Sequence, residues 1–155
     1  MRLQKNTSIA LCSVLDAAAD PARQIVAAEI ADKYGVSSHH LAKVLRQLGR
    51  AGLLESSRGV GGGYRFCGNA KRLTLLNVIE LFEDISARPA ESGDREYATD
   101  EGRAIARVLA EIDATAKATF GSITIATMLK IVANANPRDA GGASKAASHP
   151  SPPRT

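Results

Sequence analysis

The sequence has few of the residues that build disulfide, metal or membrane-spanning structures. Its 155 residues include two cysteines and no tryptophan. Because Cys12 and Cys67 lie far apart in the chain, they give no disulfide framework. No run of 18 apolar residues predicts a membrane span. The N-terminus lacks an apolar core followed by small residues, so we expect no signal peptide. These features predict a cytoplasmic protein with one domain and an extension.

Motifs for catalysis and for nucleotide binding are also missing. No Ser/His/Asp order, paired-carboxylate pocket or metal motif stands out in the sequence, so we expect neither an enzyme nor a metal site. A phosphate-binding loop needs Gly-Lys-Ser/Thr, or a helix directly after its glycines. Here the glycine run 59–63 leads into a strand-like Tyr-Arg-Phe. His39 and His40 are adjacent, point about 100° apart on a helix and cannot easily share a metal.

Charge is distributed unevenly along the chain. The net charge is +4, with a pI of about 9.3. Residues 37–72 contain seven Lys or Arg and one acid, whereas residues 73–113 contain four Arg and ten acids. A segment of net +6 followed by one of net −6 indicates one face for a polyanion and another directed away from it. Two ordinary solvated faces would give the same pattern.

Apolar spacing and turn residues predict a mainly helical chain. Asp20-Pro21 ends a first helix, and Gly35 ends a second. After the third helix, a strand over 53–56, a glycine-rich tip and a return over 64–66 form a hairpin. The helices are expected at residues 6–19, 25–34, 37–50, 74–85, 99–120 and 122–132.

The third predicted helix has an apolar side and a basic side. Ser37 is a suitable N-cap for it. Its apolar residues recur at i, i+3, i+4 and i+7 and form a buried stripe: Leu41, Val44, Leu45 and Leu48. The opposite side carries His39, Lys43, Arg46 and Arg50. Two helices joined by a short turn that contains glycine, with the second basic outside, predict a helix-turn-helix.

The predicted hairpin carries a cation on each side of its glycine run. Arg58 and Arg65 can bind phosphates or a narrow minor groove, and the glycines leave room for close approach to DNA. This arrangement predicts a wing, which is a hairpin lying on the nucleic-acid backbone or in the minor groove. A tight hairpin with exposed arginines is the alternative.

The long helix over 99–120 has no evident partner within the chain. Its apolar stripe covers about four turns and consists of Ile105, Val108, Leu109, Ile112 and Ala116. Pairing with the same helix of a second copy would bury this stripe, and two-fold dimers are the commonest oligomers. Alternatively, the helix folds back onto the helices at 6–19 and 74–85.

These segments resemble the IscR/NsrR-type (Rrf-two) family of bacterial winged helix-turn-helix transcription regulators. The resemblance covers about residues 1–132, and its most specific part is the Arg-Gly and Gly-Gly-Tyr wing. It is carried by the runs MRLQKNTSIALCSVLDAAA, GVSSHHLAKVLRQLGRAGLL, SSRGVGGGYRF, LTLLNVIELFEDI and SITIATML. It implies a mainly α fold with a small β-hairpin wing and a long C-terminal dimerisation helix.

The resemblance also implies which residues bind DNA. A homodimer would contact a partly palindromic double-stranded operator, with the third helix in the major groove and Arg58 through Arg65 along the backbone and minor groove. Together with the pattern above, this gives the expected DNA-binding residues: Ser38, His39, His40, Lys43, Arg46, Gln47, Arg58, Gly59, Gly61, Gly62, Gly63, Tyr64 and Arg65.

The sequence departs from the family at its cofactor site. Many members hold an iron–sulfur cluster through three closely spaced cysteines in the loop before the long helix. In this chain that loop, residues 86–97, contains no cysteine and no histidine, and Ser8 stands where the NsrR branch has an acidic ligand. A thiolate-ligated cluster needs several cysteines, so we expect no cofactor. The signal is then open: oxidation of Cys67, a small ligand between the wing domain and the long helix, or a partner protein.

We therefore expect a sequence-specific DNA-binding regulator that acts as a homodimeric repressor. The alternatives are a winged-helix module that binds proteins, or a thiol-redox-responsive regulator acting through Cys67. The expected organisation is a DNA-binding domain over 1–85, a linker loop over 86–98, dimerisation and short C-terminal helices over 99–132 and a disordered tail over 133–155.

Overall fold

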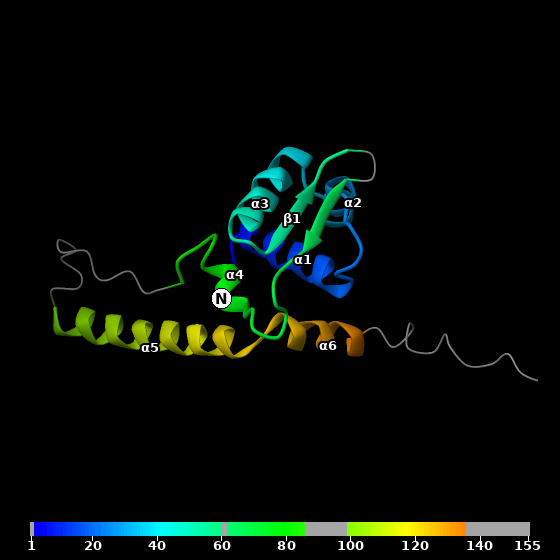
Figure 1. Cartoon of the computed structure of the whole chain (residues 1–155). Helices are drawn as coiled ribbons and strands as arrows, with labels where there is room; N and C mark the ends of the chain where they lie inside the picture. Colours follow the sequence, from blue (N-terminus) through cyan, green and yellow to red (C-terminus); the bar gives the residue numbers. More distant parts are fainter. Residues whose placement is uncertain (1, 60–61, 86–98, 136–155) are drawn as a thin grey trace, which may run out of the picture.

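The computed structural model describes residues 2–59, 62–85 and 99–135, and within them the chain is mainly helical with one hairpin (Figure 1). This confirms the expected fold class. Of the helices in these ranges, none has the length and apolar character that a membrane span requires. The elements are α1 (Lys5–Ala19), α2 (Ala27–Tyr34), α3 (Ser38–Arg50), β1 (Leu54–Ser57), β2 (Gly63–Phe66), α4 (Leu75–Ile79), α5 (Asp100–Ser122) and α6 (Ile125–Ala135).

The first three helices pack together around the stripe of α3. All four predicted stripe residues of this helix are at most 2% exposed, and α3 contacts both α1 and α2. Burial of each large aliphatic side chain contributes about 1.5–3 kcal/mol. The predicted caps are also present. The Ser37 hydroxyl accepts a hydrogen bond from the backbone N–H of His40, and Gly35 has a φ of 60° at the end of α2.

The hairpin has an additional backbone partner that the sequence did not suggest. β1 and β2 pair antiparallel, with Glu55 opposite Arg65 and Ser56 opposite Tyr64. On the other edge of β2, Ile25 forms an isolated bridge with Tyr64 through two backbone hydrogen bonds of 2.8 Å. Ile25 is therefore bridged to the edge of the hairpin, and α2 begins at Ala27 rather than at residue 25.

The helix after the wing is short. Thr74 and Asn77 form a capping box at the start of α4, as the predicted start requires. The helix ends at Ile79 and not at 85, because the following residues form turns. In these turns the N–H groups of Phe82 and Glu83 both bond to the carbonyl of Ile79.

The joint between α5 and α6 is fixed to the start of α4. Leu75 N–H bonds to Ile123 O at 2.9 Å, and Ile125 N–H bonds to Leu73 O at 2.8 Å. We expected Ser122 to open the last helix, but it is the last residue of α5.

The ends of α5 and α6 can be compared with the predicted bounds of the linker and the tail. Thr99 caps the N-terminus of α5 as expected, with its hydroxyl accepting from Gly102 N–H. Helix α6 runs to Ala135, so residues 133–135 are helical and are not part of a disordered tail. The predicted linker over 86–98 and the rest of the tail, 136–155, lie outside the described residues. The division into domains stays a prediction.

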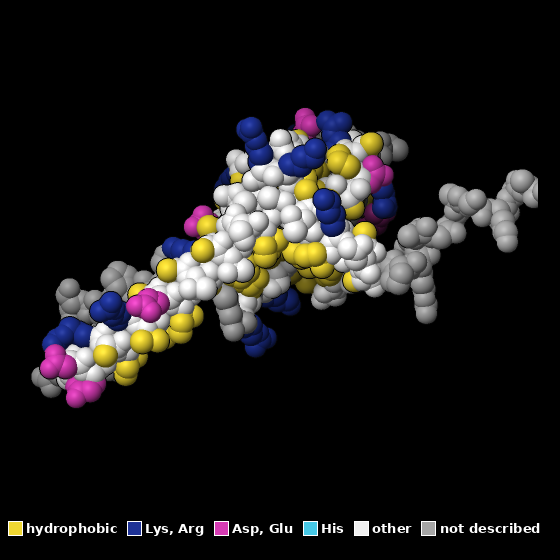
Figure 2. Space-filling view, turned by 90° about the horizontal axis from the view of Figure 1, so that it is seen from below, with side chains coloured by type: hydrophobic (Ala, Val, Ile, Leu, Met, Phe, Trp, Pro, Cys, Tyr) yellow, Lys and Arg dark blue, Asp and Glu magenta, His cyan; other side chains and the backbone are white. Residues whose placement is uncertain are grey.

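Helix α5 exposes its apolar stripe. Ile105, Val108, Leu109 and Ile112 are between 46% and 57% exposed. Figure 2 shows apolar side chains running along this helix and continuing beneath the body of the molecule. The alternative in which the stripe folds back onto α1 and α4 is therefore wrong for these four residues, although α5 does contact α4. Ala116, the fifth predicted stripe residue, is half-buried.

Candidate nucleic-acid interface

Helix α3 presents cations on the side opposite its buried stripe. Lys43 and Arg46 are exposed, as are Ser38 and His39 at its N-terminal end. Neither Lys43 nor Arg46 forms an ion pair with any described residue. A short helix with unpaired cations on one face is suited to phosphate oxygens and base edges in a major groove.

His40 and Gln47 lie differently from the other predicted residues of α3. The His40 side chain is half-buried, and its Nε2 atom is buried with no hydrogen-bond partner in the structure. The Gln47 amide is exposed but donates a hydrogen bond to the backbone carbonyl of Leu81. In this conformation Gln47 ties α3 to the turn after α4. Whether either residue contacts DNA stays a prediction.

The two arginines of the wing have different surroundings. Arg58 follows β1, is exposed and forms no ion pair within the described ranges. Arg65 pairs with Glu55 at 2.9 Å across the hairpin, and both side chains are more than half exposed. An exposed ion pair of this kind contributes about 0–1 kcal/mol, so Arg65 can exchange Glu55 for a phosphate at little cost. Sequence reasoning missed this pairing, because it depends on the register of the hairpin.

The backbone of the hairpin itself requires glycine at three positions of the wing. Gly59 has a φ of 106°, which side chains rarely adopt. A Cβ on Gly62 would lie 2.5 Å from the carbonyl oxygen of Ser57, and one on Gly63 would lie 2.6 Å from that of Ile25. The hairpin therefore needs these glycines whether or not DNA approaches them. Gly61, also a predicted contact, lies outside the described residues.

A groove joins α3, the recognition helix of the predicted helix-turn-helix, to the wing. Its volume is about 500 Å³, and Arg46 on α3 faces it together with Arg58 and Tyr64 from the hairpin. These three predicted site residues are thus brought together from segments 12 to 18 positions apart in the chain. Glu55 also lines the groove and supplies the opposite charge.

The two thiols differ in accessibility. Cys67, the predicted redox residue, is exposed, and its thiol donates to the Gly52 carbonyl at 3.2 Å. Cys12 is half-buried; burial and the nearby Asp16 raise its pKa, while the neighbouring Tyr34 hydroxyl and the charge of Lys33 act in the opposite direction. A raised pKa lowers the thiolate fraction, which makes Cys12 the less reactive thiol. Redox activity of Cys67 stays a prediction.

Comparison with known proteins identifies the family. The model of the Rrf2 family, described as an iron-dependent transcriptional regulator, matches residues 3–131. The chain belongs to the Rrf2 family. It is a DNA-binding transcriptional regulator of the winged helix-turn-helix class.

Two curated relatives are similar in sequence. BadM of Rhodopseudomonas palustris, named as a candidate HTH-type transcriptional regulator, is 53% identical over 134 residues, which is 85% of this chain and 83% of BadM. Protein aau3 of Rhizobium meliloti is 42% identical over 84 residues, or 54% of each chain.

Solved structures show the same fold. CymR of B. subtilis, described as the global cysteine regulator, has a TM-score of 0.69 at 20% identity, covering 84% of this chain and 98% of CymR. IscR of T. potens has a TM-score of 0.68 at 20% identity, covering 87% of this chain and 90% of IscR.

This Rrf2 member offers few cysteine donors for an iron–sulfur cluster. The whole sequence offers two cysteines, one half-buried on α1 and one exposed after β2. In the part of the chain that the structure describes, no group of three or more His, Cys, Asp or Glu is placed to hold a metal ion. Clusters of this kind are held mainly by four Cys, or by Cys and His.

Proposed function

We propose that this Rrf2 regulator binds its operator through α3 and the wing. The observation that carries the proposal is the groove where Arg46 of the recognition helix and Arg58 of the wing face the same space. One face can then contact base edges and the flanking backbone together. Lys43 lies exposed on the same helix and adds a third cation.

The operator-bound form in this proposal is a homodimer joined through α5. Four large apolar side chains of α5 are about half exposed in the single chain. A contiguous apolar stripe of this kind marks an interaction surface. A second copy supplies the same stripe, and a two-fold axis would present two recognition helices to a partly palindromic site.

The proposal includes repression, a cytoplasmic location and no enzymatic activity. A dimer that covers promoter DNA blocks its use by polymerase without any further partner, so repression is the simplest outcome. Bacterial operators lie in the cytoplasm. The exposed charged residues of α3 and the wing suit a polyanion and include no nucleophile paired with a base.

We also propose that this member works without an iron–sulfur cluster. The reason is the donor set, since two cysteines on different elements do not supply the ligands that a cluster needs. The signal that releases DNA must then reach the protein by another route.

The operator proposal is tested by measuring binding to the protein's own promoter fragment with a scrambled competitor. Lys43→Ala and Arg58→Ala should each weaken binding, by about 1–3 kcal/mol where the contact is to a base edge. Lys130→Ala, an exposed position on α6, is the matched control and should bind as the unaltered protein does. Binding should weaken as salt rises, because cations release counterions from phosphates.

Unchanged binding in both Lys43→Ala and Arg58→Ala would remove α3 and the wing from the interface. Equal affinity for the promoter fragment and its scrambled competitor would favour the alternative of a module that recognises acidic partners without reading sequence.

A further inference from the structure

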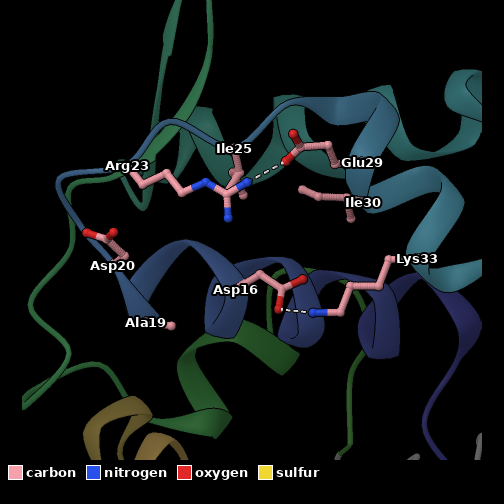
Figure 3. Close-up of a pocket in the computed structure, with 8 residues that line it drawn as sticks. All are labelled: Asp16, Ala19, Asp20, Arg23, Ile25, Glu29, Ile30 and Lys33. Carbon is pink, nitrogen blue, oxygen red and sulfur yellow. Dashed lines mark hydrogen bonds and ion pairs between the residues drawn. The ribbon is translucent and has the colours of Figure 1, made fainter. Parts of the chain in front are cut away.

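A cavity of about 290 Å³ lies on α1 and α2, and none of its lining residues is a predicted DNA contact. It is formed by the C-terminal half of α1, the connection that follows it and one side of α2 (Figure 3). Its apolar part consists of Ala19, Ile25 and Ile30, and both isoleucines are at most 5% exposed. The two isoleucines on the apolar side of the cavity therefore belong to the core.

Two ion pairs flank this cavity, and each joins separate elements. Arg23 of the connection bonds to Glu29 of α2 at 3.0 Å, and Lys33 of α2 bonds to Asp16 of α1 at 2.6 Å. Figure 3 shows the two pairs on opposite sides of the cavity. Positive and negative groups thus face the same small space from both sides.

A ligand can replace one of these two ion pairs more easily than the other. Asp16 is 23% exposed and also accepts a hydrogen bond from the Tyr34 hydroxyl, so its pair with Lys33 is part of a packed network. The side chains of Arg23 and Glu29 are 60% and 54% exposed. Water screens such a pair and keeps it weak. The Arg23–Glu29 pair is the one that a ligand can replace.

We propose that this cavity binds a small zwitterion that carries one carboxylate, one ammonium group and an apolar side chain. The carboxylate would take the place of Glu29 on the Arg23 guanidinium, whose fork matches carboxylate geometry. The ammonium would take the place of Arg23 on Glu29. A ligand with both charges leaves neither released side chain unpaired, and its apolar part lies on Ile25 and Ile30.

The cavity lies beside elements that contact the DNA-binding helix and the wing. Ile25 is bonded through its backbone to Tyr64 of the wing, and α2 packs on α3. A role for the ligand as an effector rests on the proposed function, whereas its binding does not. The experiment therefore measures binding to the full-length protein without DNA.

Three probes of matching size separate the chemical requirements. L-leucine carries both charges, 4-methylpentanoate lacks the ammonium, and 3-methylbutylamine lacks the carboxylate. Titration into protein labelled at its isoleucine methyl groups should shift the signals of Ile25 and Ile30. Leucine should bind at least roughly tenfold more tightly than either single-charge probe, because each lost contact is a hydrogen bond to a charged group.

Variants test the assigned partners. Arg23→Gln should weaken leucine binding to about the affinity that 3-methylbutylamine has for the unaltered protein. Glu29→Gln should weaken it to about the affinity that 4-methylpentanoate has for the unaltered protein. Arg72→Gln, an exposed arginine outside the cavity, should bind leucine unchanged. The proposal is overturned if leucine leaves the two isoleucine signals in place, if 4-methylpentanoate binds as tightly as leucine, or if both cavity variants bind like the control.

Discussion

At the scale of single residues, the glycines of the wing show how one residue type can have two explanations. A glycine run beside arginines favours close approach to DNA, and the structure adds a reason that holds without DNA. The backbone at Gly62 passes so near Ser57 that no side chain fits, whereas the helical Gly49 has ordinary space at 3.5 Å from the Leu54 carbonyl. Substitution by alanine should therefore change the free energy of unfolding in opposite directions at the two sites.

We expect Gly62→Ala to lower the free energy of unfolding by about 1–3 kcal/mol, because the added methyl group must displace backbone. Gly49→Ala should raise it by about 0.5–1 kcal/mol, because alanine restricts the unfolded chain and suits a helix. Urea unfolding of both variants checks the pair. A Gly62→Ala protein as stable as the unaltered one would contradict the close approach.

A second residue-scale feature links α1 to α2 through Asp16. The carboxylate accepts from the Tyr34 hydroxyl at 2.9 Å and from Lys33 at 2.6 Å. Burial, followed by the interactions with Asp16, raises the pKa of Tyr34 above its ordinary value of 10.0. A pKa that is raised on folding contributes stability below the unfolded value, and this contribution is lost as pH rises through the folded value.

Tyr34→Phe should therefore lower stability at neutral pH by roughly 1 kcal/mol, the usual contribution of one hydrogen bond. As pH rises past 10.0, the unfolded tyrosine ionises first, so the difference between the two proteins should shrink. Unfolding midpoints of both proteins measured across this range check the sign. A difference that grows with pH would show that the hydroxyl is not held in its neutral form.

At the scale of elements, α5 differs most from the rest of the chain. The stripe of α3 is buried within the chain, but the stripe of α5 is not, although both follow helical spacing. The difference arises because α5 contacts the body through α4, at the opposite end from Thr99, while most of its length extends beyond the core (Figure 1). A second copy of the chain is the partner that we propose for it.

Replacing both Ile105 and Ile112 by Glu should convert the proposed dimer into a monomer. Two charges would enter an apolar contact, and the dissociation constant should rise at least roughly hundredfold. Ala110→Glu is the control, because Ala110 is exposed and five positions from Ile105, on another side of the helix. Sedimentation equilibrium gives the association state, and circular dichroism verifies that α5 still forms. A double variant that stays dimeric would place the dimer contact elsewhere.

At the scale of the whole molecule, two backbone bridges join segments that lie far apart in the chain. Ile25 pairs with Tyr64 on one edge of the wing, and the α5–α6 joint pairs with the residues that lead from the wing into α4. The hairpin and the C-terminal end of α5 are thus each held by backbone hydrogen bonds to segments far away in the sequence.

A whole-molecule consequence concerns iron. We expect the protein, purified without oxygen, to be colourless and to contain no stoichiometric iron, because two separated cysteines cannot hold a cluster. Iron analysis and visible absorption test this, before and after incubation with iron and sulfide. A brown protein whose absorption is lost in Cys12→Ser or Cys67→Ser would show that the two thiols bind a cluster after all.

The sequence by itself determined the order of elements and the family. Those signals are local: the spacing of α3, the Ser37 cap, the glycine after α2 and the Arg-Gly wing each occupy a few consecutive residues. Their physical cause is backbone preference and side-chain periodicity, which act over one or two turns. The exposed cations of α3 follow from the same periodicity.

Only the tertiary structure decided what depends on distant residues. It placed Ile25 in a bridge to the hairpin instead of a helix, bonded Gln47 to Leu81, paired Arg65 with Glu55 and left the stripe of α5 exposed. It also formed the cavity between α1 and α2. Each of these depends on which segments meet in space, and such contacts are set by packing of the whole chain rather than by any short stretch of it.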